Sequence, residues 1–366
     1  MARYQGNYKV KGFTCWIQFL TMSLGQLTNR ESLRDTVQCL SAHQLKLYHL
    51  GINYPVHLST LALANENRNW QIYADFAQML LTKAQQLYLH DDFGLELANA
   101  VYALDATTID LCLSVFWWAS FRTTKAAVKL HTLLDLRGNL PTFIRITDGK
   151  MHDVNSLDEL IFEPCAIYLM DKGYLDFARL YQLHQAQAFF VTRAKTNLAC
   201  AYLASRKVTK EQGLRCDQDI KLTTYKSRQG YPEKLRRVKY YDQKQGKTYV
   251  FLTNNFTITA LEVALLYKHR WHLELLFKWI KQHLKVKKFG GESENAVKTQ
   301  IWIAICTYLM MAIVKKELKR EKSLYEILQI ISVSVFDKSP LHQLLNQSQL
   351  EILEESTSKQ LILFGL

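Results

Sequence analysis

The sequence lacks the cysteine patterns that hold disulfide-rich domains or zinc sites together. Seven cysteines are scattered along 366 residues, and no two of them form a CxxC pair. An odd, unpatterned set in a large chain is typical of a reducing cytosol and argues against a disulfide framework. We therefore expect a cytoplasmic protein stabilised by a hydrophobic core, for which 48% hydrophobic residues are sufficient.

Long hydrophobic runs are missing as well. Residues 1–6 contain no apolar signal region. The most apolar run, residues 301–314, is too short to cross a bilayer easily, because a spanning helix needs about 20 apolar residues. This run predicts a buried helix over residues 296–315, and we expect no membrane association.

Acidic residues are few in comparison with basic ones. The chain has 46 lysines and arginines against 33 aspartates and glutamates, which gives a formal charge of +13. A protein this basic commonly meets a polyanion, either nucleic acid or an acidic membrane surface.

Most of this charge lies in residues 193–248, where 15 lysines and arginines accompany 5 acidic residues, a balance of +10. Five tyrosines are interleaved with the cations: Tyr202, Tyr225, Tyr231, Tyr240 and Tyr241. Cations neutralise phosphates and aromatic faces stack on unpaired bases, so the one-sided charge favours nucleic-acid binding. The alternative is a solvated β layer with lysines along its edges.

Residues 1–95 have helical spacing and predict an α-helical N-terminal domain for DNA binding or assembly. Helices are expected at 13–24 and 70–89. Thr28 and Glu31 have the spacing of a capping box for another helix.

The pattern changes at residue 96. Strands are predicted at 101–111, 126–136, 140–147, 166–170 and 189–192, with helices at 154–162 and 177–187. Three strands, helix, strand, helix and strand is the order of a ribonuclease H-like mixed sheet, which predicts an α/β fold.

The segments after this sheet complete the expected domain organisation. We expect the first part of the sheet domain over 96–192, a basic β-rich insertion over 193–250, the completion of the domain over 251–320 and a helical tail over 321–366. Strands of the insertion are expected at 221–226 and 238–252. A basic segment at 285–291 and a short apolar end at 360–364 complete the chain.

One predicted helix, residues 267–281, combines apolar and charged positions. Tyr267, Arg270, Glu274 and Lys281 fall on one stripe about 60° wide, and a second stripe is apolar. Thr259 with Glu262 predicts a capping box at the start of this segment. Alone, such a stripe is most simply a solvated charged face.

Three carboxylates stand in apolar elements, where an ionised carboxylate is costly unless it is paired or bound to metal. Asp105 lies in the first predicted strand, Asp171 ends the fourth, and Glu274 lies on the late helix. Three such oxygen donors suit magnesium or manganese. Two ions can activate an attacking water or hydroxyl and stabilise the leaving oxygen of a phosphodiester.

In this hypothesis Asp105 bridges both ions, while Asp171 and Glu274 each complete one site. Arg270 and Lys281 are placed to hold phosphates, and Tyr267 to contact a phosphate or sugar.

Other residues compete for these roles. Asp110 could replace Asp105 as the metal ligand. Asp148 is most simply part of a turn, and Asp153 with His152 a helix cap. His131, on an apolar strand, is most simply a hydrogen-bonded core histidine. Spacing alone does not decide between these alternatives.

The four residues of the late helix match the pattern Y-x2-R-x3-E-x6-K without a gap. This pattern resembles the signature of bacterial transposases of the insertion-sequence-four family, which carry a DDE catalytic triad. Residues 104–111 and 168–176 are similar to the first and second aspartate motifs of that family. The resemblance covers roughly residues 1–320.

The resemblance implies a ribonuclease H-like catalytic domain with a β-rich insertion before the glutamate helix. It also implies magnesium-dependent DNA cleavage and strand transfer, with Asp105, Asp171 and Glu274 as the triad. The expected partners are double-stranded DNA with terminal inverted repeats, target DNA and a second copy in an active homodimer. Members that cut through a hairpin use an aromatic residue of the insertion, which here contains tyrosines and no tryptophan.

Two alternative functions stay open at this point. A shortened or inactive relative binds DNA without cutting it. A hydrolase that uses a carboxylate pair acts on another substrate, and its affinity for DNA does not depend strongly on salt.

Overall fold

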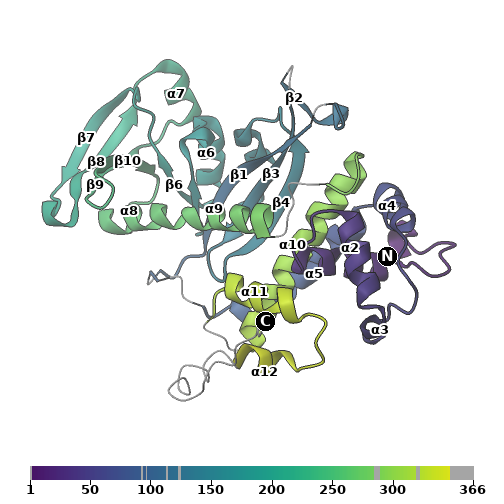
Figure 1. Cartoon of the computed structure of the whole chain (residues 1–366). Coiled ribbons are helices and arrows are strands. Elements are labelled where there is room, and N and C mark those ends of the chain that lie inside the picture. Colours follow the sequence, from purple (N-terminus) through teal and green to yellow (C-terminus); the bar gives the residue numbers. More distant parts are fainter. Residues whose placement is uncertain are drawn as a thin grey trace, which may run out of the picture. The chain divides into compact units, whose positions relative to one another are not determined.

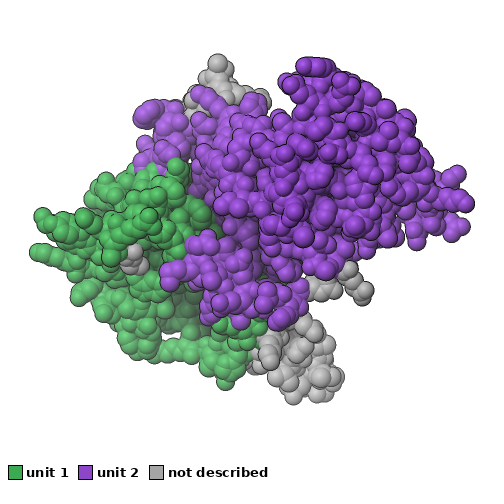
Figure 2. Space-filling view, turned by 180° about the vertical axis from the view of Figure 1, so that it is seen from behind, with its two compact units in different colours: residues 1–77, 283–291, 295–366 green, residues 78–282, 292–294 purple. Residues whose placement is uncertain are grey.

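The computed structural model describes residues 2–91, 94–95, 97–112, 114–122, 125–283, 289–318 and 322–346 (Figure 1). Most of the predicted basic segment and the whole apolar end at 360–364 lie outside these residues. The chain forms two compact units, coloured in Figure 2. We name residues 1–77, 283–291 and 295–366 the helical unit, and residues 78–282 and 292–294 the sheet unit. The five-part division expected from the sequence stays a prediction.

The first part of the chain is helical, as predicted. Its α-helices are α1 (Cys15–Leu27), α2 (Leu33–Ala42), α3 (Gln44–Leu47), α4 (Leu58–Asn67) and α5 (Gln71–Tyr88), and its 3-10 turns are Ala2–Tyr4 and Tyr48–Leu50. The predicted capping box of Thr28 and Glu31 is wrong. Thr28 instead ends α1 by donating its hydroxyl to the Leu24 carbonyl at 2.7 Å. Ser32 caps α2 and accepts from the Asp35 N–H at 3.0 Å.

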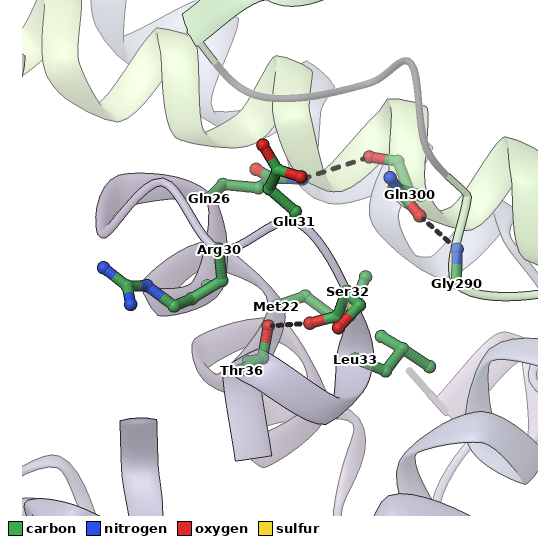
Figure 3. A pocket seen from close by; sticks show the side chains of 10 residues that line it. Met22, Gln26, Arg30, Glu31, Ser32, Leu33, Thr36, Gly290 and Gln300 are labelled. Atoms are coloured by element: carbon green, nitrogen blue, oxygen red, sulfur yellow. Dashed lines mark hydrogen bonds between the residues drawn. The ribbon is translucent and has the colours of Figure 1, made fainter. Parts of the chain in front are cut away.

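A small cavity of about 30 Å³ lies where α2 approaches residue Gly290 in the helical unit (Figure 3). The Gly290 N–H donates to Gln300 Oε1 at 3.0 Å, and Thr36 donates to the Ser32 carbonyl at 2.9 Å. A Cβ on Gly290 would approach Leu33 to 2.5 Å. The cavity has room for about one water molecule, so it is a packing feature.

The last part of the chain forms α10 (Glu294–Glu317), α11 (Leu324–Ser334) and α12 (Leu341–Asn346). α10 confirms the predicted buried helix. It is the one described helix that is long and apolar enough to cross a membrane, but 78% of its most apolar stretch is buried within the protein. A core helix has the same composition, so this length is weak support for a membrane span.

The sheet unit contains one ten-stranded mixed sheet (Figure 1). Its strands are β1 (Val101–Leu111), β2 (Ser120–Arg122), β3 (Lys125–Asp135), β4 (Leu140–Asp148), β5 (Ile167–Met170), β6 (Phe189–Arg193), β7 (Cys200–Arg206), β8 (Leu214–Leu222), β9 (Leu235–Asp242) and β10 (Lys247–Thr253). Their order is β2-β3-β1-β5-β6-β10-β9-β8-β7, and β4 also pairs with β3. The sequence pattern did not predict β2 and β7, and the expected strand at 221–226 overlaps β8 only at residues 221–222.

Pairing directions divide this sheet into three stretches. β4, β3 and β1 form the predicted antiparallel meander. β1, β5 and β6 are parallel neighbours. β10 then pairs antiparallel with β6, so the strands of the insertion extend the same sheet instead of forming a separate layer.

Glycine and asparagine build the turn predicted between β3 and β4. Gly138 has φ 80° and Asn139 has φ 55°, both left-handed. A Cβ on Gly138 would also meet the Tyr88 ring at 2.4 Å. The turn therefore requires glycine for both its conformation and its packing.

The insertion differs from the prediction in detail. Residues 238–252 form two strands, because Gly246 adopts φ 63° and turns the chain between β9 and β10. Residues 225–230 form helix α7 (Tyr225–Gly230), where a strand ending at 226 was expected. Directly after α7, Tyr231 is fully buried and its hydroxyl lies 2.7 Å from His184 Nδ1. Burial of this large ring is a tertiary interaction that overrides local β propensity.

Short helical elements connect and flank the sheet. They are the 3-10 turns Trp117–Ala119, Asp153–Glu159, Lys172–Tyr174 and Lys210–Gln212, the helices α6 (Phe177–Gln185), α8 (Ala260–His269) and α9 (Trp271–Lys278), and the π-helical turn Trp279–His283. β5 is buried at all four positions, as predicted, and it lies among the apolar side chains of the sheet core. The carboxyl end of this rigid strand is where the candidate site begins.

Candidate active site

Strand pairing brings two of the predicted carboxylates together. In the parallel pair of β1 and β5, Leu104 lies opposite Met170, and both side chains are fully buried. The next residues of the two strands are Asp105 and Asp171, 66 positions apart in the sequence. The parallel register therefore places both aspartates at the same level of the sheet. The buried residues that precede them, Leu104 and Met170, hold the two strands in the core.

Arg270 connects the first of these aspartates to Glu274. Its Nη1 donates to Asp105 Oδ2, and its Nη2 donates to Glu274 Oε1 at 2.7 Å. The Asp105 side chain is 21% exposed, whereas that of Glu274 is 60% exposed. One guanidinium therefore holds a carboxylate of the sheet and a carboxylate of α9 at a common point.

Tyr267 holds the second aspartate. Its hydroxyl donates to Asp171 Oδ1 at 3.1 Å, and its ring packs against Phe251 of β10 with centroids 4.9 Å apart. Arg193 Nη1 lies 4.0 Å from the same carboxylate oxygen. Asp171 thus faces one neutral donor and one cation.

The helix that carries these residues is interrupted, whereas the sequence predicted one continuous helix over 267–281. α8 ends at His269 and α9 begins at Trp271. The Arg270 N–H bonds to the Tyr267 carbonyl and the Leu273 N–H to the Arg270 carbonyl, which are i→i+3 bonds of a tighter turn. The predicted capping box at the start of α8 is confirmed, since Thr259 and Glu262 bond reciprocally.

Lys281 lies in the π-helical turn Trp279–His283. Its ammonium donates to the Thr108 carbonyl of β1 at 2.6 Å. Wider turns of this kind occur frequently at functional sites, because one residue is displaced from the regular helical path. Here the turn directs the last residue of the signature toward the strand that bears Asp105.

The electrostatics show that the carboxylates are close enough to act on one another. Burial raises the pKa of Asp105 from 3.8 to about 6; Arg270 opposes this shift, and the negative charges of Asp171 and Glu274 add to it. Burial also raises the pKa of Tyr267, and the neighbouring Asp171 charge raises it further. Tyr267 therefore stays a neutral hydrogen-bond donor at neutral pH.

The donor set fits a hard divalent cation in kind, because all three candidate ligands are carboxylates. Among the described residues, no group of three His, Cys, Asp or Glu is arranged as a metal site. Arg270 bonds both Asp105 Oδ2 and Glu274 Oε1, so its positive charge lies between these two carboxylates.

The competing residues have other environments. Asp110 is exposed near the far end of β1 and does not join the cluster. Asp148 Oδ1 accepts from the N–H groups of Lys150 and Met151, which is the predicted turn. His131 is fully buried with Nε2 3.0 Å from Thr147 Oγ1, as predicted for a core histidine.

Asp153 pairs with Lys129 at 3.0 Å. His152 precedes the 3-10 turn that Asp153 begins, but its side chain makes no capping hydrogen bond. The predicted cap is therefore wrong in its bonding, although the turn begins where it was expected.

Comparison with known proteins identifies the family of the chain. A family model described as a transposase DDE domain matches residues 97–310, more than half of the chain. The chain belongs to the transposase DDE domain family. A second model, a domain of unknown function (DUF4372), matches residues 1–53.

Three relatives carry transposase names. The chain is 33% identical to transposase y4zB of Sinorhizobium fredii over 57% of its own length and 59% of that protein. It is 25% identical to the transposase for insertion sequence element IS5377 of Geobacillus stearothermophilus, over 72% of this chain and 69% of that protein. It is 25% identical to the transposase for IS4SA of Synechocystis, over 70% and 71%. The resemblance to the insertion-sequence-four family is confirmed. The match to transposase y4zB covers less than two thirds of the length of that protein.

Arg193 belongs to the candidate active site, although the sequence reading missed it. β5 and β6 are parallel, and Met170 lies opposite Thr192. The next residues are Asp171 and Arg193, the same relation that places Asp105 beside Asp171. Parallel pairing of adjacent predicted strands was the signal that could have found it.

A cavity of about 600 Å³ adjoins the candidate active site, and sequence reasoning missed it too. Tyr267, Arg270 and Glu274 line it together with Trp271, whose side chain is largely exposed. The cavity is bounded by cations, aromatic rings and the two carboxylates of Asp242 and Glu274, and its cations and rings suit a nucleotide in their chemistry.

Proposed function

We propose that this chain is the transposase of an insertion-sequence element, which cleaves DNA at the element ends and transfers the strands to target DNA. The observation that supports this most is the bridge from Asp105 through Arg270 to Glu274, with Asp171 at the adjacent strand end. Three carboxylates distant in sequence converge beside cations that can bind phosphate. This proposal assigns the triad to Asp105, Asp171 and Glu274.

The sheet supports a ribonuclease H-like catalytic domain. The order β4-β3-β1-β5-β6, with an antiparallel meander followed by parallel strands, agrees with the order of elements expected from the sequence. In this proposal residues 96–192 and 251–320 form the catalytic domain, 193–250 its insertion, 1–95 a DNA-binding or assembly domain and 321–366 a tail.

Asp105, Asp171 and Glu274 would hold two divalent ions, magnesium or manganese. When bound, such ions supply activation of the attacking oxygen and stabilisation of the leaving one. Their binding requires the carboxylates to be ionised and released from Arg270.

The other signature residues then act on DNA. Arg270 presents a planar guanidinium suited to bidentate phosphate binding, and a phosphate competes for it with Asp105 and Glu274. Lys281 supplies a point charge beside β1, and Tyr267 orients the Asp171 carboxylate through its hydrogen bond.

The partners follow from the reaction and the charge. A formal charge of +13 supports binding to double-stranded DNA with terminal inverted repeats and to target DNA. A homodimer holds the two ends of one element in the active complex. We place the protein in the bacterial cytoplasm, associated with the nucleoid.

The test is metal-dependent nicking of supercoiled DNA that carries the element ends. Asp105→Ala, Asp171→Ala and Glu274→Ala should each lower nicking by about 10³-fold or more while DNA binding survives, because each removes charge stabilisation worth several kcal/mol. Asp110→Ala is the matched control, since it removes an exposed aspartate from the same strand.

The outcomes separate the candidate functions. Retained nicking in one alanine variant removes that residue from the triad. DNA binding by the wild-type chain without any nicking supports the inactive, DNA-binding alternative. Weak binding that does not fall with salt contradicts a nucleic-acid function altogether.

A further inference from the structure

β3 places a threonine directly beside the first aspartate of the candidate active site. In the antiparallel pair of β1 and β3, Thr132 lies opposite Asp105. Residues directly opposite each other point to the same face of a sheet, with Cβ atoms about 4.5–5.5 Å apart. The Thr132 side chain therefore adjoins the carboxylate that Arg270 bonds.

The hydroxyl of Thr132 is buried and unsatisfied. The residue is 0% exposed, and its Oγ1 has no hydrogen-bond partner among the described residues. Other threonines of the sheet donate to backbone carbonyls, Thr142 to that of Leu133 at 3.1 Å and Thr192 to that of Asp171 at 3.2 Å. Burying a hydroxyl without a partner costs stability, so a valine would suit a purely structural position better.

Asp105 has acceptor capacity left for this hydroxyl. Its Oδ1 accepts from the Ala106 N–H at 2.8 Å, and its Oδ2 accepts from Arg270. Each carboxylate oxygen has two lone pairs, so each can accept a further hydrogen bond. Loss of the Arg270 bond would free Oδ2 to turn toward the hydroxyl on the neighbouring strand.

The guanidinium of Arg270 is not fully satisfied by its two carboxylates. Its Nε is buried and has no partner in the described part of the chain. A phosphate that binds the guanidinium in a bidentate pair through Nε would satisfy this atom and draw Arg270 away from Asp105. The two residues that adjoin the Asp105 carboxylate, Arg270 and Thr132, thus each have a buried polar group without a partner.

We propose that Thr132 is a positioning residue for Asp105, and that its hydroxyl donates to the carboxylate once Arg270 has released it to a divalent ion. Carboxylates that bind metal are themselves held by hydrogen bonds, which fix their orientation. Thr132 suits this role because its β-branched side chain has restricted rotation and β3 is paired with β1 on one side and β4 on the other. This inference rests on the proposed function and adds a residue to its site.

The experiment is a Mn²⁺ titration of the full chain, followed by electron paramagnetic resonance. Thr132→Val removes the hydroxyl and should weaken Mn²⁺ binding by about 10–100-fold, the usual cost of losing a hydrogen bond to a metal ligand. Thr132→Ser keeps the hydroxyl and should bind Mn²⁺ like wild type. The proposal is wrong if the valine variant keeps its Mn²⁺ affinity, or if the serine variant loses as much affinity as the valine variant.

Stability should follow the opposite order in these two variants. Thr132→Val should unfold at the same urea concentration as wild type or at a higher one, because it removes an unsatisfied buried hydroxyl. Thr132→Ser should unfold at a lower concentration, because it loses a buried methyl group. A threonine with a purely structural role would not weaken metal binding in the more stable variant and preserve it in the less stable one.

Nicking of DNA gives a second readout. The Mn²⁺ concentration for half-maximal nicking should rise in Thr132→Val by the same factor as the dissociation constant. The KM for DNA should stay unchanged, because the hydroxyl contacts the carboxylate and no phosphate. A raised KM for DNA with an unchanged Mn²⁺ requirement would assign Thr132 to DNA binding and contradict the positioning role.

Thr299 of α10, in the helical unit, supplies the matched control. It is 0% exposed, and within the described ranges its hydroxyl also lacks a partner. Thr299→Val makes the same chemical change and should leave Mn²⁺ binding as in wild type. An equal loss of affinity in this variant would trace the effect to packing and overturn the assignment of Thr132.

Asp105→Ala, titrated in parallel, separates this inference from the proposed function. If Asp105→Ala binds Mn²⁺ like wild type, the metal site of the proposed function is wrong. If Asp105→Ala loses Mn²⁺ binding while Thr132→Val keeps it, the metal site stands and Thr132 does not position Asp105.

Discussion

Two networks of carboxylates and arginines lie in the sheet unit, and their charge balance differs. In the insertion, Asp217 and Asp219 are accompanied by Arg206, Lys234 and Arg236. In the candidate active site, three carboxylates share Arg270 and the more distant Arg193. The first network has more cations than anions, and the second has fewer.

The pKa values follow this difference. Burial alone raises the pKa of Asp217, but Arg236 and Arg206 lower it below its usual value. Burial raises the pKa of Asp105 to about 6, and Arg270 does not reverse the shift because Asp171 and Glu274 add negative charge. A network that compensates its charges stabilises the fold, whereas one that leaves negative charge uncompensated is prepared for a cation ligand.

The largest expected effect on stability is in the insertion network. Arg236→Ala should lower the free energy of unfolding by about 3–5 kcal/mol, because it leaves buried Asp217 without its bidentate partner. It also removes the donors to the Asn255 and Ile258 carbonyls that precede α8. Urea denaturation followed by intrinsic fluorescence measures the change.

Arg237→Ala is the control for this prediction, because it removes the same charge from the next position of β9 on the exposed side. Its effect on stability should stay within about 1 kcal/mol. Equal destabilisation by the two substitutions would show that the buried pair of Arg236 and Asp217 contributes no more to stability than Arg237 does.

The second prediction concerns the active-site network, where a substitution should raise the free energy of unfolding instead of lowering it. In metal-free buffer at about pH 8, Asp105→Asn should raise the free energy of unfolding by up to about 3 kcal/mol, the equivalent of a pKa raised from 3.8 to about 6. An acid with a raised pKa in the folded state loses stability as pH rises through this window. The gain should therefore vanish below about pH 4, where aspartate is protonated in both states.

Thermal unfolding at several pH values in the presence of a chelator tests whether Asp105→Asn stabilises the protein at high pH. If Asp105→Asn destabilises the protein at high pH, the carboxylate is fully compensated in the free protein, and the contrast between the two networks fails. Asp110→Asn, on the exposed end of β1, should show no such pH dependence.

The smallest expected effect concerns the competition between Arg270 and metal. Arg270→Gln should tighten Mn²⁺ binding in the absence of DNA by about tenfold, or about 1.4 kcal/mol, since Asp105 and Glu274 are released and repel each other. Mn²⁺ titration followed by electron paramagnetic resonance measures the affinity directly. The same variant should lose nicking, because it also loses a phosphate ligand.

Arg193→Gln is the control here, since Arg193 lies farther from its carboxylate and bridges none. Its effect on Mn²⁺ affinity should be smaller. Weaker Mn²⁺ binding in Arg270→Gln would mean that the guanidinium holds the carboxylates in position for the metal instead of competing with it.

Much of the fold could be predicted from local patterns. The buried strand β5, the meander of β1, β3 and β4, and the capping box of α8 depend on apolar runs, turn residues and i,i+3 spacing, which are local. The start of α2 and helix α7 were mispredicted because Thr28 bonds backward to α1 and Tyr231 is drawn into the core. Both depend on partners outside the local window.

The four signature positions, the two aspartate motifs and the basic character of the insertion could be found without a structure, because residue types and their spacing are local properties. The placement of Asp105 beside Asp171, with Arg193 next to them, depended on the fold, because the register of parallel strands comes from long-range pairing. The fold also determined that Arg236 pairs with the buried Asp217, whereas Arg237 and Lys239 lie on the half-buried side of β9. Net charge is a sum over the sequence, whereas the fold determines which charges are paired and which lie on the less buried side of a strand.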